Sequence, residues 1–108
     1  MNATFDDFMK LDMRIGTIKE VDVVPDADKL LKLMVDCGED SLRQIISGIR
    51  EFFEDPQELV GVQCTFVVNL EPRTIRGFES QGMIMGVGED TFVPLIPMNP
   101  VEPGTKVQ

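Results

Sequence analysis

The chain has 108 residues and a formal net charge of −9, with 10 Lys and Arg against 19 Asp and Glu, and it contains no His, Trp or Tyr. This length suits one compact domain, and the absence of His excludes catalytic triads, Cys-His pairs and imidazole metal ligands within the chain. The acidic balance argues against a generic basic nucleic-acid coat, because phosphate binding normally uses a surplus of Lys and Arg.

The first predicted elements are a capped helix and a long strand. A short helix is predicted over residues 4–9, where Thr4 is placed to cap the N-terminus. From residue 11 to 24, apolar and polar residues alternate, which indicates a half-buried strand. Gly16 interrupts this strand and predicts a bulge or a sharp bend.

The rest of the chain is divided by Gly, Pro and Asp into short elements. Helical turns are predicted over 49–54 and 56–59, the second capped by Asp55. Residues 69–81 form a long polar connection without helix or strand signals. Apolar and β-branched segments predict further strands over 30–37, 41–47, 62–68, 83–87 and 91–97, with hairpin turns at 38–42 and 88–92.

The order of these elements predicts the fold class. Five strands with a helical segment between the third and the fourth is the order of the OB-fold, a small Greek-key barrel. We therefore expect an all-β domain with short helices, consisting of a five-stranded OB-fold barrel and an extra strand after it.

The sequence contains no recognised catalytic or metal-binding motif. Glycine-rich phosphate loops and nucleophile elbows are absent. Asp26 and Asp28 begin like a calcium loop, but Leu31 and Cys37 stand where that loop needs Gly and Glu. We predict that the chain is not an enzyme and uses no cofactor or metal.

The compartment is predicted from what the chain lacks. No apolar run approaches the roughly 20 residues that span a bilayer, and the first residues lack the features of a signal peptide. We expect a cytoplasmic protein without a membrane partner. In that compartment Cys37 and Cys64 are expected to be small buried residues, the alternative being a redox pair.

Several segments occur in order along the chain and together resemble a known family. They are KLDMRIG at 10–16, PDADKLLKL at 25–33, SGIR at 47–50, DPQELVG at 55–61 and NLEPRTIRGFESQGM at 69–83. They resemble the tRNA-binding domain found at the C-terminus of many methionyl-tRNA synthetases. The same domain occurs in free-standing dimeric tRNA-binding proteins, in cytokine-like synthetase cofactors and in a related export chaperone. The resemblance covers about residues 5–107.

The resemblance implies one domain over residues 1–108, with a barrel core at about 10–88 and a C-terminal extension at about 89–108 that helps to build a homodimer. It also implies non-catalytic binding of tRNA, by a free-standing protein or by a partner or domain of the methionyl-tRNA synthetase catalytic chain. The positions that match the tRNA-contacting parts of the family are Lys29, Lys32, Arg43, Asn69, Arg73, Arg76, Ser80 and Met83.

Each residue type in this set suits a part of RNA. The lysines suit phosphates, and Arg73 and Arg76 suit phosphates or unpaired bases. Asn69 and Ser80 can bond a 2′-hydroxyl or a base edge, and Met83 offers a surface for stacking. The structural alternatives are surface solubility for the charged residues, turn formation for Asn69 and Ser80, and core packing for Met83.

Departures from the basic members of the family bear on affinity. Glu71 and Thr74 stand where those members often carry Lys or Arg, and Asp26 lies in the first loop. We therefore predict weak, salt-sensitive tRNA binding confined to a small basic rim. The alternative is a protein-binding chaperone or a synthetase assembly adaptor on the same fold, which the acidity would suit. The two hypotheses differ in whether the basic residues share one rim or are interspersed with acidic ones.

Overall fold

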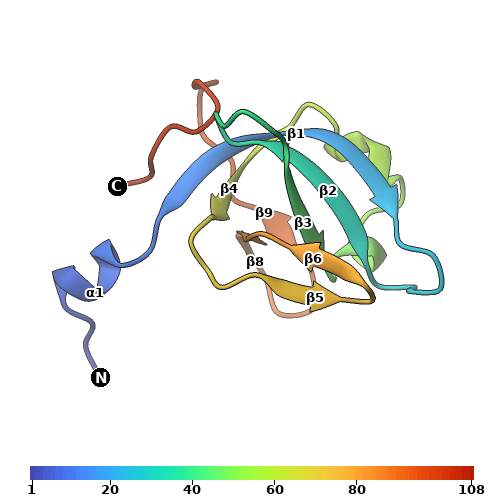
Figure 1. The fold of residues 1–108 in the computed structure, drawn as a ribbon, viewed down its shortest axis with the longest axis horizontal. Helices are drawn as coiled ribbons and strands as arrows, with labels where there is room; N and C mark the ends of the chain where they lie inside the picture. Colours follow the sequence, from blue (N-terminus) through green and yellow to red (C-terminus); the bar gives the residue numbers. More distant parts are fainter.

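The computed structural model describes residues 1–108 and shows a mostly β molecule (Figure 1). Its elements are α1 (Phe5–Met9), β1 (Met13–Val23), β2 (Leu31–Asp36), β3 (Arg43–Ser47), the 3₁₀ turns η1 (Arg50–Phe52) and η2 (Pro56–Leu59), β4 (Gln63–Val67), β5 (Arg73–Ile75), β6 (Phe78–Ser80), β7 (Met83–Ile84), β8 (Gly86–Val87) and β9 (Val93–Pro94). Five strands form one sheet in the order β3-β2-β1-β4-β7, with the hairpins β5–β6 and β8–β9 beside it. This nearly closed barrel confirms the predicted OB-fold.

Strand β1 is the central strand of the barrel. It pairs antiparallel with β4 along its first half and with β2 along its second half. The pairing with β2 shifts register between Ile18 and Glu20, so the bulge lies further along the strand than Gly16, where the sequence predicted an irregularity. Gly16 is needed for space instead, because a Cβ there would lie 2.5 Å from the Val35 side chain.

Alternate residues of the strands fill the barrel interior. Along β2, Leu31, Leu33 and Val35 are fully buried, whereas the residues between them are partly exposed. This is the period of two that a strand with one core-facing side shows. Ile45 of β3 and Phe66 of β4 join the same hydrophobic core.

Both cysteines are buried and carry free thiols, in agreement with the structural role predicted for Cys37 and Cys64. Burial raises the pKa of each thiol to about 11. Both thiols are therefore protonated at neutral pH, and they lack the thiolate character that reactive cysteines need.

Side chains help to close the barrel between β3 and the segment that leads into β7. The Gln81 N–H donates to the Gln44 carbonyl at 2.8 Å, and the Gln44 N–H donates to Oε1 of Gln81 at 3.0 Å. The Ile46 N–H donates to the Ser80 hydroxyl at 3.0 Å. Backbone groups on this edge of β3 are thus satisfied partly by side chains, where a regular ladder would use backbone carbonyls.

Residues 69–81 contain the β5–β6 hairpin, so the prediction of a connection without regular structure was wrong. The hairpin turns at Arg76 and Gly77, between the paired residues Ile75 and Phe78. The two turn residues have φ angles of +52° and +84°. Positive φ at both central positions is characteristic of the type I′ turn, which matches the twist of the flanking strands.

Other elements differ from the prediction mainly in length. The strands predicted over 83–87 and 91–97 are the two-residue strands β7, β8 and β9, and the helix predicted over 49–54 is the single turn η1. The cap predicted at Asp55 is confirmed, since its carboxylate accepts the Gln57 N–H at 3.1 Å.

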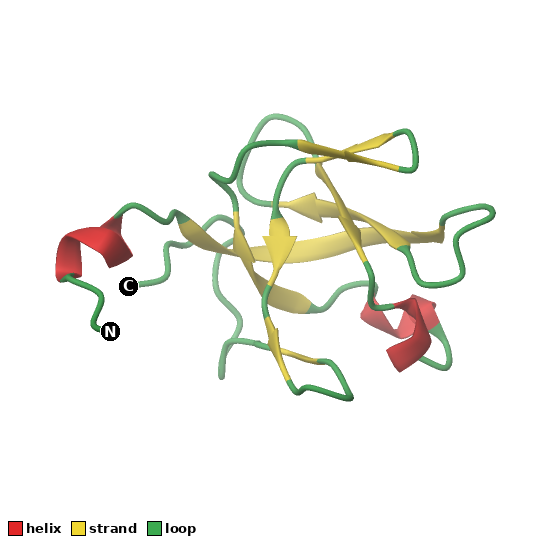
Figure 2. Ribbon diagram, turned by 90° about the horizontal axis from the view of Figure 1, so that it is seen from below, coloured by secondary structure: helices red, strands yellow, loops and turns green.

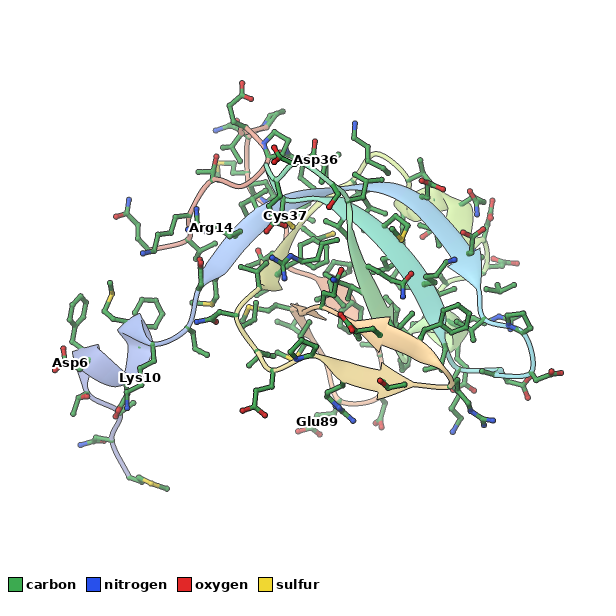
Figure 3. The ribbon with its side chains drawn as sticks, in the orientation of Figure 1. Asp6, Lys10, Arg14, Asp36, Cys37 and Glu89 are labelled. Atoms are coloured by element: carbon green, nitrogen blue, oxygen red, sulfur yellow. The ribbon has the colours of Figure 1, made fainter.

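Helix α1 projects from the barrel, and helical turns lie at both ends of the molecule (Figure 2). The predicted cap is confirmed, because Thr4 Oγ1 accepts the Asp7 N–H at 3.1 Å and the Asp7 carboxylate accepts the Thr4 N–H at 3.0 Å. No residue of α1 is buried, and Figure 3 shows Asp6 on this helix and Lys10 directly after it. None of the helices has the length and apolar character to cross a membrane.

After β9 the chain returns to β1. The Gly104 N–H donates to the Ile15 carbonyl at 2.7 Å, and the Ile15 N–H donates to the Thr105 carbonyl at 2.9 Å. The C-terminal residues thereby add an edge to the first part of β1. The boundary expected near residue 88 falls in the turn between β8 and β9.

Candidate nucleic-acid interface

The β5–β6 hairpin packs across β3 and presents one side toward it (Figure 1). Opposite residues of an antiparallel pair point to the same side. Arg73 and Ser80 therefore share a side with Ile75 and Phe78, whereas Glu79 points to the other side. Because the Ser80 hydroxyl bonds to β3, the first side is the one that faces the barrel.

Lys32 of β2 meets this side of the hairpin. Its ammonium nitrogen lies 5.5 Å from the centre of the Phe78 ring, a cation–π geometry. Lys32 lies between the buried residues Leu31 and Leu33, so its side chain leaves the outer face of the barrel. The aromatic ring holds the cation in place and leaves its N–H groups free to bind an anion.

The turn of the hairpin meets the loop between β1 and β2. Lys29 and Arg76 line one hollow of about 340 Å³ between these segments, together with Asp26 and Asp28. The fold thus brings together two predicted basic residues that are far apart in the sequence. Two carboxylates share the hollow, so its local charge is mixed.

A second, smaller hollow lies beside the hairpin and is called the hairpin slot below. Its volume is about 100 Å³, and its walls are mostly apolar, with one acidic and one basic side chain. Its lining includes Ile46, Leu70, Glu71, Arg73, Ile75 and Met83. Met83, for which core packing was the alternative, is about half exposed.

Arg43 lies toward the other end of β3 and is engaged within the protein. Its guanidinium forms an ion pair with Glu39, with Nη2 2.6 Å from Oε2. The same group donates to the carbonyls of Val68 at 3.1 Å and Gln81 at 2.7 Å. The hydrogen bond with Glu39 raises the pKa of Arg43.

Arg43 and Arg14 line a hollow of about 330 Å³, called the paired-arginine hollow below, with Asp12, Glu39 and Cys37 also in its wall. Arg14 pairs with Asp12 at 2.6 Å and donates to the Gly104 carbonyl at 3.1 Å. Figure 3 shows Arg14 and Cys37 in this part of the molecule. Each arginine of this hollow therefore has its own carboxylate.

Asn69 and Ser80 also make internal hydrogen bonds. The Asn69 side chain accepts the Asp12 N–H at 2.8 Å and donates to the Lys10 carbonyl at 2.7 Å. Ser80 is buried, and its hydroxyl accepts the Ile46 N–H. Both side chains tie distant segments together, but Ser80 lies beneath the surface whereas Asn69 is exposed.

The basic side chains divide by whether a carboxylate pairs with them. Ion pairs occupy Lys10, Arg14 and Arg43. Of the seven others, four belong to the predicted set and lie around the β5–β6 hairpin, namely Lys29, Lys32, Arg73 and Arg76. Arg50 adds a further unpaired cation that the prediction omitted, and its backbone N–H donates to the Lys29 carbonyl at 3.2 Å. Its place in the SGIR segment was the available sequence signal.

Comparison with known protein families identifies relatives of this chain. The family model described as "Putative tRNA binding domain" matches residues 13–106. The methionine–tRNA ligase of Bacteroides fragilis is 44% identical over 109 aligned positions, which cover 99% of this chain and 16% of that protein. The corresponding ligase of Methanococcoides burtonii is 46% identical over 104 positions, covering 94% of this chain and 15% of that protein. The chain thus spans about a sixth of the length of these relatives.

Solved structures show the same fold over the whole chain. The chaperone CsaA from Bacillus anthracis aligns with a TM-score of 0.88 at 34% identity, covering 100% of both chains. A MetRS-related protein from Pyrococcus horikoshii aligns with a TM-score of 0.88 at 32% identity, covering 100% of this chain and 99% of that one. Strand order, sequence segments and family match agree, and the chain belongs to the tRNA-binding domain family.

Proposed function

We propose that this chain is a non-catalytic module that binds tRNA by shape and backbone contacts, on the surface formed by the β5–β6 hairpin and the loop between β1 and β2. The observation that carries this proposal is the gathering of four cations without carboxylate partners around one hairpin: Lys29, Lys32, Arg73 and Arg76. Contacts to phosphate fix the register of a protein on RNA without reading sequence, and duplex RNA is recognised mostly by its shape.

The eight predicted residues then divide into three roles. The four unpaired cations contact phosphates, and exposed Met83 offers a surface on which a base can rest. Arg43, Asn69 and Ser80 act as positioning residues, because each hydrogen-bonds within the protein. These bonds support the segments on either side of the hairpin.

The relatives indicate a setting for this activity. A tRNA-binding module attached to, or associated with, a methionyl-tRNA synthetase would hold tRNA near the catalytic chain and raise its effective concentration. A free-standing module would bind and release tRNA independently. We propose the cytoplasm as the compartment in either setting.

We also propose a homodimer. The segment after β9 exposes Leu95, Ile96 and Met98, and the last two line a hollow of about 450 Å³. An exposed apolar surface of this kind favours association with a second copy of the same chain.

Light scattering tests the homodimer. It should give twice the 12.1 kDa chain mass for the wild type and the single chain mass for Ile96→Glu. Val23→Glu, a change at another exposed apolar residue, should stay dimeric; a monomeric wild type would contradict the proposal.

The second candidate function is binding of a protein partner. Asp26 and Asp28 beside Lys29 and Arg76 give that hollow mixed charge, which suits a protein surface as well as RNA. The structural likeness to the chaperone CsaA supports this candidate.

The decisive experiment measures retention of a tRNA transcript on filters across a salt series. Saturable binding is expected at low salt, with a slope of log affinity against log salt of about −3 to −4 for four phosphate contacts. Double-stranded DNA of matched length serves as the control for a generic polyanion and should bind more weakly. A folded protein without saturable tRNA binding at low salt would favour the protein-binding candidate.

A further inference from the structure

The hairpin slot has features that phosphate contacts do not use. Its floor and walls include the apolar side chains of Ile46, Ile75, Leu70 and Met83. Its volume of about 100 Å³ is well below the roughly 300–1,000 Å³ of pockets for drug-sized ligands. A slot of this size accommodates a single small ring with apolar faces, whereas a phosphate group gains nothing from apolar walls.

Two charged side chains of the slot are unengaged. Glu71 and Arg73 are both exposed, and neither takes part in an ion pair or a side-chain hydrogen bond. The Ser80 hydroxyl, by contrast, is already bonded to Ile46 at the base of the slot. The polar groups left for a ligand are therefore one carboxylate acceptor and one guanidinium donor.

The slot lies within the surface proposed to bind tRNA. Arg73 belongs to the side of the hairpin that faces the barrel, and Phe78 with Lys32 lies further along that side. Unpaired bases of RNA are recognised by stacking on side chains and by hydrogen bonds to their edges. An acceptor and a donor at one small apolar slot match that kind of ligand.

Resting on the tRNA-binding function proposed above, we infer that the hairpin slot holds one unpaired cytosine base and that Glu71 selects it. Cytosine is a single ring whose exocyclic amine at N4 donates, and Glu accepts from that amine. The O2 and N3 atoms of the same edge accept, and the planar guanidinium of Arg73, which has five N–H groups, can donate to them as well as to a phosphate. Uracil presents a carbonyl at the position of the amine, so its oxygen would face the Glu71 carboxylate without a hydrogen between them.

Glu71 has a role in binding a base that it cannot have in binding a phosphate. A carboxylate in a phosphate-binding surface weakens binding by charge repulsion. At a base edge it gains a hydrogen bond that distinguishes one base from another. The surface would then bind RNA through its cations and prefer one base at one position.

The test compares octamers of cytidine and of uridine, which carry the same number of phosphates. Filter binding at one salt concentration measures both dissociation constants for the wild-type chain, with tRNA measured in parallel. We expect the cytidine octamer to bind about fivefold or more tightly than the uridine octamer. Glu71→Gln should bring this ratio close to one, because an amide can donate to the uracil carbonyl as well as accept from the cytosine amine.

Glu79→Gln is the matched control. It removes the same charge from the same hairpin, but Glu79 points away from the slot, so the wild-type ratio should persist. Any of three results would overturn the inference: the wild type binds the two octamers equally, the wild type binds neither, or Glu71→Gln and Glu79→Gln lose the cytidine-to-uridine affinity ratio to the same extent. If tRNA still binds in those cases, the proposed function stands; if tRNA does not bind either, both fail. Circular dichroism melting confirms that each variant is folded.

Discussion

Two regions of this molecule each contain two arginines and differ in what those arginines touch. In the paired-arginine hollow, Arg14 and Arg43 each lie 2.6 Å from a carboxylate oxygen. Around the β5–β6 hairpin, Arg73 and Arg76 have no such partner. The net charge of −9 applies to both regions equally, so it cannot distinguish them. Pairing within the fold decides which cations remain available to a ligand.

The difference also separates two uses of one residue type. The Arg43 guanidinium joins three segments, since its partners are Glu39, Val68 and Gln81. Its five N–H groups in a rigid plane suit this purpose. Arg76 instead stands at an exposed turn, where it shares a hollow with Lys29 and forms no ion pair.

The largest effect is expected from removing Arg43. Arg43→Ala leaves the Val68 and Gln81 carbonyls without their donor, and we expect the free energy of unfolding to fall by about 2 kcal/mol. Urea unfolding measures this loss, and Arg43→Lys should restore only part of it, because an ammonium cannot reproduce the planar set of bonds. The slope of tRNA affinity against salt should stay at the wild-type value in both variants. A shallower slope would show that Arg43 contacts phosphate directly.

The next largest effect is expected from a change at the β5–β6 hairpin, where the arginines form no ion pair. Arg76→Asn removes the charge and places at positive φ a residue that type I′ turns favour. We expect the melting temperature to be unchanged or higher, tRNA affinity to fall about tenfold, and the salt slope to become shallower by about one. Filter binding across salt concentrations measures both binding quantities.

Lys106→Gln is the control for Arg76→Asn. It removes one positive charge beside Arg14, at the end of the molecule that holds the paired arginines. Its effect on tRNA affinity should be small and should leave the slope unchanged. Equal effects of the two variants would mean that total charge, and not position, governs binding.

The barrel could be predicted from the sequence because its signals are local. Alternating apolar residues along β2 mark the core side of a strand, and the caps at Thr4 and Asp55 use groups two or three residues away. The β5–β6 hairpin was missed because its strands have only three residues each, and Arg-Gly is not among the usual turn pairs.

The state of the candidate site residues could not be predicted in the same way. Arg43 finds its carbonyl partners 25 and 38 residues further along the chain, and Ser80 meets Ile46 across 34 residues. Such contacts depend on how the barrel closes, which cannot be predicted from residue types and their spacing along the chain. The position of Lys32 over Phe78 likewise required the hairpin, which the sequence pattern did not reveal.

A smaller effect is expected from removing the ion pair between Glu39 and Arg43, which tests whether that pair alone keeps Arg43 from binding RNA. Glu39→Gln removes the ion pair but leaves the two carbonyls that Arg43 also bonds. We therefore expect tRNA affinity to stay within about twofold of the wild type, since the loss of one surface charge changes little. Asp40→Asn, a neighbouring change outside any ion pair, controls for net charge. A fivefold gain confined to Glu39→Gln would show that a released Arg43 reaches the RNA.

The smallest effect concerns how the stability that the paired-arginine hollow contributes changes with pH. The hydrogen bond from Arg14 holds the pKa of Asp12 below its ordinary value of 3.8. A carboxyl with a lower pKa in the folded than in the unfolded chain stabilises the fold fully above the unfolded value. That contribution then declines as the pH falls below 3.8 and the folded carboxyl is protonated. Because the pair is partly exposed, it contributes less than about 1 kcal/mol. Urea unfolding from pH 7 to pH 3 should therefore show Asp12→Asn less stable than the wild type at neutral pH, with the difference in unfolding free energy shrinking as the pH falls below 3.8. A difference that is the same at every pH would assign the loss to packing.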